Sequence, residues 1–144
     1  MAEHRSELVI PVLRKPAITL EQLQRYAKAS GDWNPIHLDE AAAKARGLDA
    51  VIAHGMLSMG FIGQLLTDAA GAGSVHRIRV RFGGMVKVGD ELTCCGRVTS
   101  LEVVDDGRRI AGVEVWAENQ RGERVTYGDA EVFVTGHRYS VHSS

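Results

Sequence analysis

The segment Ser-Gly-Asp-Trp-Asn-Pro-Ile-His, residues 30–37, contains the side chains best suited to chemistry. Pro35 disfavours the helical region for the residue before it, and Gly and Asn form turns, so the segment is predicted to be a loop. The loop contains an acid, Asp32, and an imidazole, His37, separated by a turn that can bring them together. A histidine exchanges protons near neutral pH, and a carboxylate can orient it or share a water with it. The alternative is an ordinary Asx-turn with a capping Asp32 and a surface His37.

A second segment, Ala53-His54-Gly55-Met56-Leu57, begins the most apolar stretch of the chain. Gly55 would stand at the start of a helix, where free backbone N–H groups and the helix dipole favour negative charge. A glycine there also lets an oxygen atom approach the main chain. Such a donor can stabilise an oxyanion by about 3 kcal/mol. The alternative is a plain helix start.

Residues 26–43 resemble the signature of the (R)-specific enoyl-CoA hydratases, the MaoC-like dehydratases. The signature is an aromatic residue, a short spacer, S-G-D-x-N-P-I-H, five residues and a small residue, and it runs here from Tyr26 to Ala43. The segment beginning at Ala53 follows at the spacing that the family shows. Ala29 departs from the usual Leu, Val, Ile or Gly at a packing position. Residues 47–60 are especially similar to the catalytic subunit of mycobacterial-type (3R)-hydroxyacyl-carrier-protein dehydratases, which work with a partner of the same fold.

The resemblance implies reversible interconversion of trans-2-enoyl thioesters and (3R)-3-hydroxyacyl thioesters. It implies that Asp32 and His37 are catalytic and hold one water, and that the Gly55 N–H stabilises the thioester oxygen. It leaves open which of the two side chains carries which proton. Asn34 would orient the catalytic pair or the substrate, although turn formation alone explains it. No cofactor is expected beyond coenzyme A or carrier-protein pantetheine as part of the substrate.

Three further side chains near these segments have competing interpretations. His54 is expected to support the catalytic loop through a hydrogen bond rather than to react itself. Asp32, His37 and His54 together have the composition of a two-histidine, one-carboxylate metal site, but hydration of a thioester needs no metal and none is predicted. Ser58 lies in a near miss of a nucleophile-elbow motif, with one residue too many before it. A serine that assists some family members corresponds to Gly63 here.

Residues 16–53 contain helix signals and no strand pattern. Thr19 stands three residues before Gln22, which is the capping-box spacing, and begins a helix that ends before the candidate loop. Asp39 is predicted to cap a second short helix that stops at Gly47. We expect this segment to form a helical overhang that carries the candidate site.

The rest of the chain predicts a helix followed by strands. Residues 54–70 are apolar nearly all round, which is typical of a buried central helix. An opening strand is predicted over Leu8–Leu13, and residues 74–135 alternate like a four-strand meander. This is an α+β pattern. The family resemblance implies that residues 1–144 form one hot-dog domain, an antiparallel sheet wrapped round a buried helix, and that such domains pair with the active site at the interface.

The central helix and the first long strand offer candidates for substrate contact. Met56, Met59 and Phe61 are candidates for the acyl tunnel. Gly60 and Gly63 each cost about 1 kcal/mol relative to alanine, which suggests close approach by another backbone or room for a ligand. Three arginines on the strand, Arg77, Arg79 and Arg81, could meet phosphates of the carrier, although a solvated outer face is the favoured interpretation.

Composition limits the remaining possibilities. The chain has 144 residues, 44% hydrophobic and 24% charged, which fits one globular domain. Its net charge of −1 gives no general attraction to nucleic acid or to an anionic membrane. Residues 1–5 lead into no hydrophobic signal region. Cys94 and Cys95 are adjacent on a predicted strand and cannot form a disulfide framework. We therefore expect a cytoplasmic protein.

Several functional assignments compete. The sequence supports two assignments almost equally: a coenzyme A hydratase, and a carrier-protein dehydratase of fatty-acid or polyketide elongation. A hot-dog thioesterase would need a carboxylate on the central helix, where only Gln64 stands between Gly55 and Leu66. A non-catalytic acyl-binding subunit would be expected to lack Asp32 or His37. The expected partner is a second hot-dog domain, in a homodimer or a heterodimer.

Overall fold

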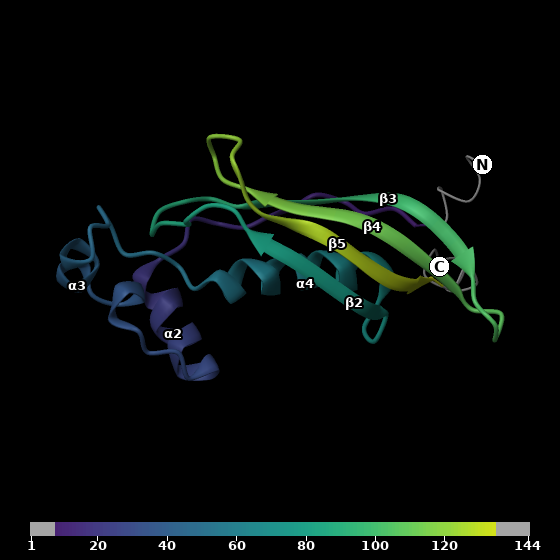
Figure 1. Cartoon of the computed structure of the whole chain (residues 1–144), viewed down its shortest axis with the longest axis horizontal. Coiled ribbons are helices and arrows are strands. Elements are labelled where there is room, and N and C mark those ends of the chain that lie inside the picture. The colour runs from purple at the N-terminus through teal and green to yellow at the C-terminus, as the bar shows by residue number, and fades with distance from the viewer. Residues whose placement is uncertain (1–7, 135–144) are drawn as a thin grey trace.

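The computed structural model of the protein describes residues 8–134. Its elements, in chain order, are β1 (Leu13–Arg14), α2 (Leu20–Ser30), the 3-10 helix η1 (Pro35–His37), α3 (Glu40–Ala45), α4 (Gly55–Ala70), β2 (Val75–Phe82), β3 (Thr93–Val103), β4 (Arg109–Glu118) and β5 (Arg124–Val134). The predicted α+β class is confirmed, because one long helix packs on a five-stranded antiparallel sheet (Figure 1). None of the helices in the described residues is long and apolar enough to cross a membrane.

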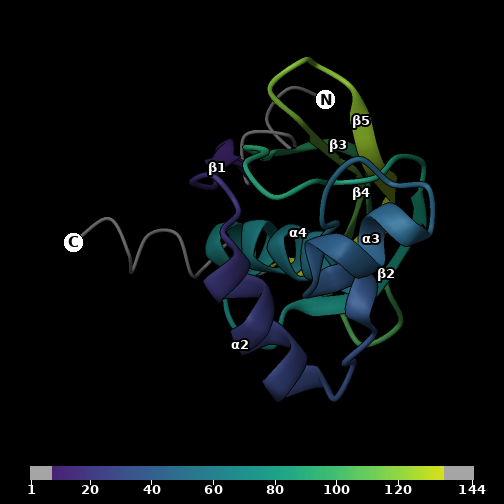
Figure 2. The same ribbon diagram turned by 90° about the vertical axis from the view of Figure 1, so that its left-hand side faces the viewer.

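The two helices predicted before the central helix begin at the expected caps. The Thr19 hydroxyl accepts the Gln22 N–H at 3.1 Å and starts α2, and the Asp39 carboxylate accepts the Ala41 N–H at 3.0 Å and starts α3. A side-chain acceptor at this position satisfies one of the N–H groups that a helix leaves unpaired. Figures 1 and 2 show α2 and α3 beyond one end of the sheet, near the start of α4. This is the overhang that the sequence predicts.

Helix α4 has the predicted bounds and lies against the inner face of the sheet (Figure 1). Its buried apolar side chains face alternating small and β-branched residues of the strands: Leu57, Phe61, Ile62, Leu65 and Leu66 from the helix, and Ala111, Val113, Val115, Ala117, Ala130 and Val132 from the sheet. Burial of each large side chain contributes about 2 kcal/mol. One side of α4 stays uncovered, since Met56 is 54% exposed and Gly60 is also exposed. The helix is therefore not buried all round.

The order of the strands differs from the predicted meander over residues 74–135. Within residues 8–134 the sheet runs β1-β3-β4-β5-β2, so only β3, β4 and β5 follow one another as neighbours. Strand β2 pairs with β5, from Phe82 opposite Thr126 to Val75 opposite Val132. The reason is the connection after β2. A tight hairpin would place β3 beside β2, whereas residues 83–92 run across to the other side of the sheet, where β3 lies between β1 and β4.

The crossing segment, residues 83–92, is held by main-chain hydrogen bonds to distant parts of the chain. The Ala53 N–H donates to the Val86 carbonyl at 2.7 Å, and the Val88 N–H donates to the Val51 carbonyl at 3.1 Å. Residues 88–91 form a turn, with Gly89 at a φ of 96°, which favours glycine. This turn changes direction within the crossing segment and does not join neighbouring strands.

The opening strand is shorter than predicted. Only Leu13 and Arg14 pair with β3, opposite Cys94 and Thr93. The predicted run Leu8–Leu13 contains Pro11, which has no N–H to donate to a ladder. Leu8 is nevertheless buried and belongs to the hydrophobic core.

Candidate active site

The loop after α2 is built from a succession of side-chain caps. Gly31 ends the helix in the left-handed conformation, at a φ of 80°. The Asp32 Oδ1 accepts the Asn34 N–H at 3.2 Å, and the Asn34 Oδ1 accepts the Ile36 N–H at 3.2 Å. The Asx-turn predicted as the alternative is therefore present. It occupies Oδ1 of Asp32 and leaves Oδ2 available.

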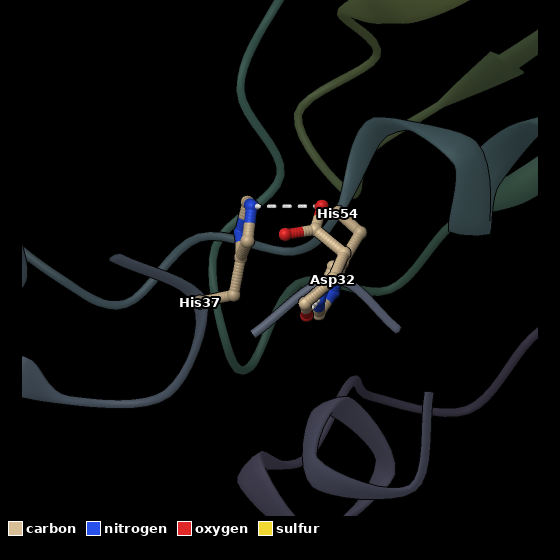
Figure 3. Close-up of side chains that lie close together, drawn as sticks. All are labelled: Asp32, His37 and His54. Carbon is tan, nitrogen blue, oxygen red and sulfur yellow. Dashed lines mark hydrogen bonds and ion pairs between the residues drawn. The ribbon is translucent and has the colours of Figure 1, made fainter. Parts of the chain in front are cut away.

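His37 lies buried at the end of this loop, with 8% of the residue exposed. Its Nδ1 lies 2.9 Å from the Ile52 carbonyl oxygen, which can only accept, so Nδ1 carries the proton. The other nitrogen, Nε2, therefore has a free lone pair. It lies 3.9 Å from Oδ2 of Asp32, and a dashed line marks this pair in Figure 3. The separation is too long for a direct hydrogen bond and suits one bridging water.

His54 fixes the position of both members of this pair. Its Nε2 lies 3.0 Å from the Asp32 backbone carbonyl and donates to it. Its ring stacks on the His37 ring, with centroids 4.0 Å apart and planes at 25°. It also contacts the Tyr26 ring, with centroids 4.8 Å apart. Its Nδ1 is buried and has no hydrogen-bond partner among the described residues. The arrangement agrees with the supporting role predicted for His54.

Asp32, His37 and His54 form the one group in residues 8–134 with donor atoms close enough to share a metal, all within 4.8 Å of one another. Their geometry does not favour one. Each imidazole already donates one nitrogen's proton to a backbone carbonyl. Stacked rings also hold their nitrogen lone pairs in nearly parallel planes, so an ion in the plane of one ring would lie outside the plane of the other. We therefore keep the prediction that Asp32, His37 and His54 do not bind a metal.

The start of α4 brings backbone donors to the same place. His54 is the N-cap residue and its side chain makes no capping hydrogen bond. The Leu57 N–H donates to the His54 carbonyl at 3.0 Å, while the Gly55 and Met56 N–H groups have no partner among the described residues. Two free donors at the positive end of a sixteen-residue helix can bind an oxygen that gains negative charge.

A cavity of about 170 Å³ lies beside His37 and Gly55, and Asp32 is not among the residues that line it. Its lining includes His37 and Gly55 together with residues of α4, the crossing segment and β5: Ile52, Ala53, His54, Ser58, Phe82, Gly84, Met85, Val86 and Thr126. The wall is mostly apolar. An added Cβ at Gly55 would lie in contact with the Phe82 ring, at 3.4 Å.

The three tunnel candidates do not line this cavity. Met56 projects into solvent on the uncovered side of α4. Phe61 is buried, and the Lys15 Nζ lies 4.8 Å from its ring centroid. Met59 is half-buried. A tunnel role for Met56, Met59 and Phe61 stays a prediction.

Several wall residues lie outside the segments that the sequence analysis connects with the site. In the sequence, Ser58 belongs only to a near miss of the nucleophile-elbow motif, although it stands one turn after Gly55 and faces the same side of the helix. Thr126, Gly84 and Met85 lie far along the chain from the candidate loop, and no local pattern places them there. The register of β5 and the path of the crossing segment bring them to the site.

Two of the three arginines of β2 form ion pairs with carboxylates of the neighbouring strand β5. Arg77 lies 3.2 Å from Glu131 and Arg79 lies 3.7 Å from Asp129. These cross-strand pairs favour the solvated outer face over a carrier-binding stripe.

The cysteines add no nucleophile. Cys94 and Cys95 are both free thiols on β3, and burial raises the pKa of the Cys94 thiol to about 11. A thiol with this pKa stays protonated and unreactive at neutral pH.

The fold and the site together define a hot-dog domain with an acid–imidazole pair opposite an uncapped helix terminus. Residues 10–120 match the family model described as MaoC like domain, and the chain belongs to this family. It is 31% identical to the (R)-hydratase from A. caviae involved in PHA biosynthesis, over 87% of this chain and 93% of that one, with a TM-score of 0.78.

Two curated relatives match this chain over a smaller share of its length or of their own. The (R)-specific enoyl-CoA hydratase of Rhodospirillum rubrum is 36% identical over 86 residues, which are 58% of this chain and 60% of that protein. A fatty acid synthase subunit beta of Gibberella zeae is 34% identical over 119 residues, which are 81% of this chain and 6% of that protein. The chain thus spans less than two thirds of the length of each.

Two structures of lower identity share the fold and are named as complexes. They are the ChsH1-ChsH2 complex, at 24% identity and a TM-score of 0.75, and the HadBC (3R-hydroxyacyl-ACP dehydratase) complex, at 22% and 0.65, both from Mycobacterium tuberculosis. Chains that share this fold therefore occur in complexes.

Proposed function

We propose that the protein is a hydro-lyase that interconverts trans-2-enoyl thioesters and (3R)-3-hydroxyacyl thioesters. The observation that carries this proposal is the free Nε2 of His37, 3.9 Å from the Asp32 carboxylate, in a cavity that also contains Gly55. The relatives named as (R)-hydratases support the same reaction.

In the hydration direction, a water held between Asp32 and His37 attacks the β-carbon of the enoyl group. His37 Nε2 accepts one water proton, and a C–O bond forms as the β-carbon loses its double bond. The electron pair moves through the α-carbon to the thioester oxygen, where the Gly55 N–H donates to the developing charge. The proton that left the water is then delivered to the α-carbon with the assistance of Asp32, which returns His37 to its neutral form, restores the thioester carbonyl and completes the addition of water.

The mechanism depends on the tautomer that the structure imposes. Since the Ile52 carbonyl accepts the Nδ1 proton, His37 presents its lone pair to the water without any rearrangement. Asn34 is engaged in the turn and thereby orients the Asp32 carboxylate, which accepts its backbone N–H. Asn34 therefore acts on the loop, and its side chain needs no contact with substrate.

A carrier-protein thioester is the second candidate substrate. The match over 81% of this chain to a protein named as a fatty acid synthase subunit favours it. The chemistry at Asp32 and His37 would be the same, run toward dehydration.

A thioesterase activity is disfavoured by the placement of Gln64. Its side chain accepts a hydrogen bond from the Lys15 Nζ at 3.1 Å and does not line the cavity. No carboxylate of α4 takes its place in the cavity wall within the described residues.

A second hot-dog domain is the proposed partner, and β2 is the edge that it would extend. Strand β2 pairs on one side only, with β5. Phe82, Met85 and Met56 are half exposed beside the cavity, and an added Cβ at Gly60 or Gly63 would meet nothing within 4 Å in the same chain. These features fit an interface in either a homodimer or a heterodimer. The free thiols further fit the reducing cytoplasm.

The decisive experiment is hydration of crotonyl-CoA by the purified protein, beside Asp32→Asn and His37→Asn. We expect (3R)-3-hydroxybutyryl-CoA from the wild type and a loss of kcat of about a thousandfold in each variant. Release of free coenzyme A without hydration would overturn the proposal in favour of a thioesterase. Turnover with the carrier-protein thioester alone would select the second candidate.

A further inference from the structure

Two buried hydroxyl groups meet in the cavity wall beside the start of α4. Ser58 is 2% exposed and Thr126 is 1% exposed, and their oxygen atoms lie 2.7 Å apart. The Ser58 Oγ also donates to the Gly55 carbonyl at 2.8 Å. A hydroxyl has one proton, so Ser58 cannot donate to both neighbours. Thr126 must therefore donate to Ser58, and the two form a one-way chain that ends on the Gly55 carbonyl.

This chain of hydrogen bonds holds one particular peptide plane. The Gly55 carbonyl belongs to the same rigid peptide unit as the Met56 N–H, so a bond that fixes the carbonyl also fixes the direction of that N–H. The neighbouring unit is held in the same way, because its carbonyl, that of His54, accepts the Leu57 N–H. Both free N–H groups at the helix start are thus oriented by hydrogen bonds to the carbonyls on the far side of their peptide units.

We infer that Ser58 and Thr126 are positioning residues that aim the Met56 N–H at the thioester oxygen, beside the Gly55 N–H. The inference rests on the proposed hydratase function and adds Met56 N–H as a second oxyanion donor. Ser58 and Thr126 themselves touch no reacting atom in this assignment. Thr126 belongs to β5, so the pair ties the first turn of α4 to the sheet, where a side-chain cap would otherwise hold it.

The stability of the fold alone does not explain why two hydroxyl groups occupy these buried positions. Replacing both partners of a buried hydrogen bond by apolar groups of the same shape is nearly neutral, so packing does not demand hydroxyls at these positions. A serine that bonds back to the carbonyl three residues earlier also competes with regular helix geometry. The pair instead suits a place where the direction of a peptide unit matters.

The test uses variants that remove a hydroxyl with little change of shape. Thr126→Val, Ser58→Ala and the double variant are assayed for crotonyl-CoA hydration, beside Thr126→Ser, which keeps the hydroxyl. Ser74→Ala is the matched control, since Ser74 is also buried and donates to the Gly71 carbonyl at 2.6 Å, beyond the opposite end of α4. The backbone amides of Gly55 and Met56 are followed by NMR in every variant.

We expect kcat to fall about tenfold in Thr126→Val and Ser58→Ala, with KM within about twofold, because the lost interaction acts in the transition state. The double variant should be no worse than either single one, since the two hydroxyls act as a unit. Thr126→Ser should keep the wild-type kcat. The Gly55 and Met56 amide resonances should move only in the variants whose kcat falls. Ser74→Ala should lower the melting temperature without changing kcat.

Each contrary result has a distinct meaning. A wild type that does not hydrate the thioester would overturn the proposed function and, with it, the catalytic role of the pair. An active wild type with an equally active Thr126→Val would overturn the positioning role alone. A loss of kcat that Thr126→Ser shares, without movement of the two amide resonances, would assign the effect to packing and also overturn the inference.

Discussion

The helices of the overhang and the central helix begin in opposite ways. Thr19, Asn34 and Asp39 each place a side-chain oxygen on a free N–H at the start of α2, η1 and α3. Helix α4 has no such cap, although a cap contributes about 1 kcal/mol. The capped helices follow the local rules that stabilise a fold, and the one that departs from them adjoins the candidate site.

The contrast separates two uses of the same chemical group. In the overhang the terminal N–H groups are satisfied internally, and the gain is a well-defined loop. At the start of α4 two N–H groups remain available, and the cost is offset by bonds elsewhere, from Ser58 to the Gly55 carbonyl and from Leu57 to the His54 carbonyl. An absent cap is thus a signal of function when the helix start is tied down by other means.

The largest loss of activity is expected from Gly55→Pro, which removes the free Gly55 N–H at the start of α4. Proline is tolerated at the first position of a helix, and His54 already has the conformation that precedes proline, with φ −61° and ψ 135°. We expect the variant to fold and to lose about a hundredfold or more in kcat for thioester hydration.

Gly55→Ala is the matched control, because it keeps the N–H and adds a Cβ only 3.4 Å from the Phe82 ring, an ordinary contact distance. It should retain activity within a few-fold of the wild type. Equal activity of folded proline and alanine variants would show that this N–H is not used.

A smaller effect is expected from His54→Phe, which alters the N-cap residue of α4. Phenylalanine can still stack on His37 and Tyr26 but cannot donate to the Asp32 carbonyl, so the loop loses one anchor. The change also removes the unpartnered Nδ1, which limits the loss of stability. We expect kcat to fall about tenfold, measured beside the melting temperature.

Tyr26→Phe controls for the ring contact, because it keeps the aromatic neighbour of His54 and removes only a hydroxyl. Its kcat should match the wild type. Full activity in His54→Phe would contradict the supporting role assigned to the His54–Asp32 hydrogen bond.

The smallest effect on activity is expected in the overhang, from Thr19→Ala. Loss of this cap should lower the free energy of unfolding by about 1 kcal/mol, measured by urea denaturation, and leave kcat unchanged. Asp39→Ala should behave alike at the start of α3. A loss of activity without a loss of stability would show that the overhang caps serve the site as well as the fold.

The sequence predicts elements and local site residues better than it predicts how strands are ordered. Helices α2, α3 and α4 begin where Thr19, Asp39 and Gly55 indicate, because capping and periodicity are local. The meander was wrong, because the pattern of each strand is satisfied by several pairings, and only the path of residues 83–92 decides among them.

The same division applies to the site. Asp32 and His37 lie on one loop, so their spacing in sequence carries information about their spacing in space. The contact between Ser58 and Thr126 joins residues far apart in the chain, and it depends on the register of β5 against β2. No local pattern encodes a contact of that kind.

The crossing segment has a consequence for how the substrate range of this protein can change. Its hydrogen bonds to Val51 and Ala53 are made by the main chain, which is indifferent to the side chains attached to it. Gly84, Met85 and Val86 thus supply cavity wall in a segment that these main-chain hydrogen bonds help to hold in place. Substitutions at Met85 can reshape the room for an acyl group without disturbing the acid–imidazole pair, so selectivity and reactivity are free to diversify independently.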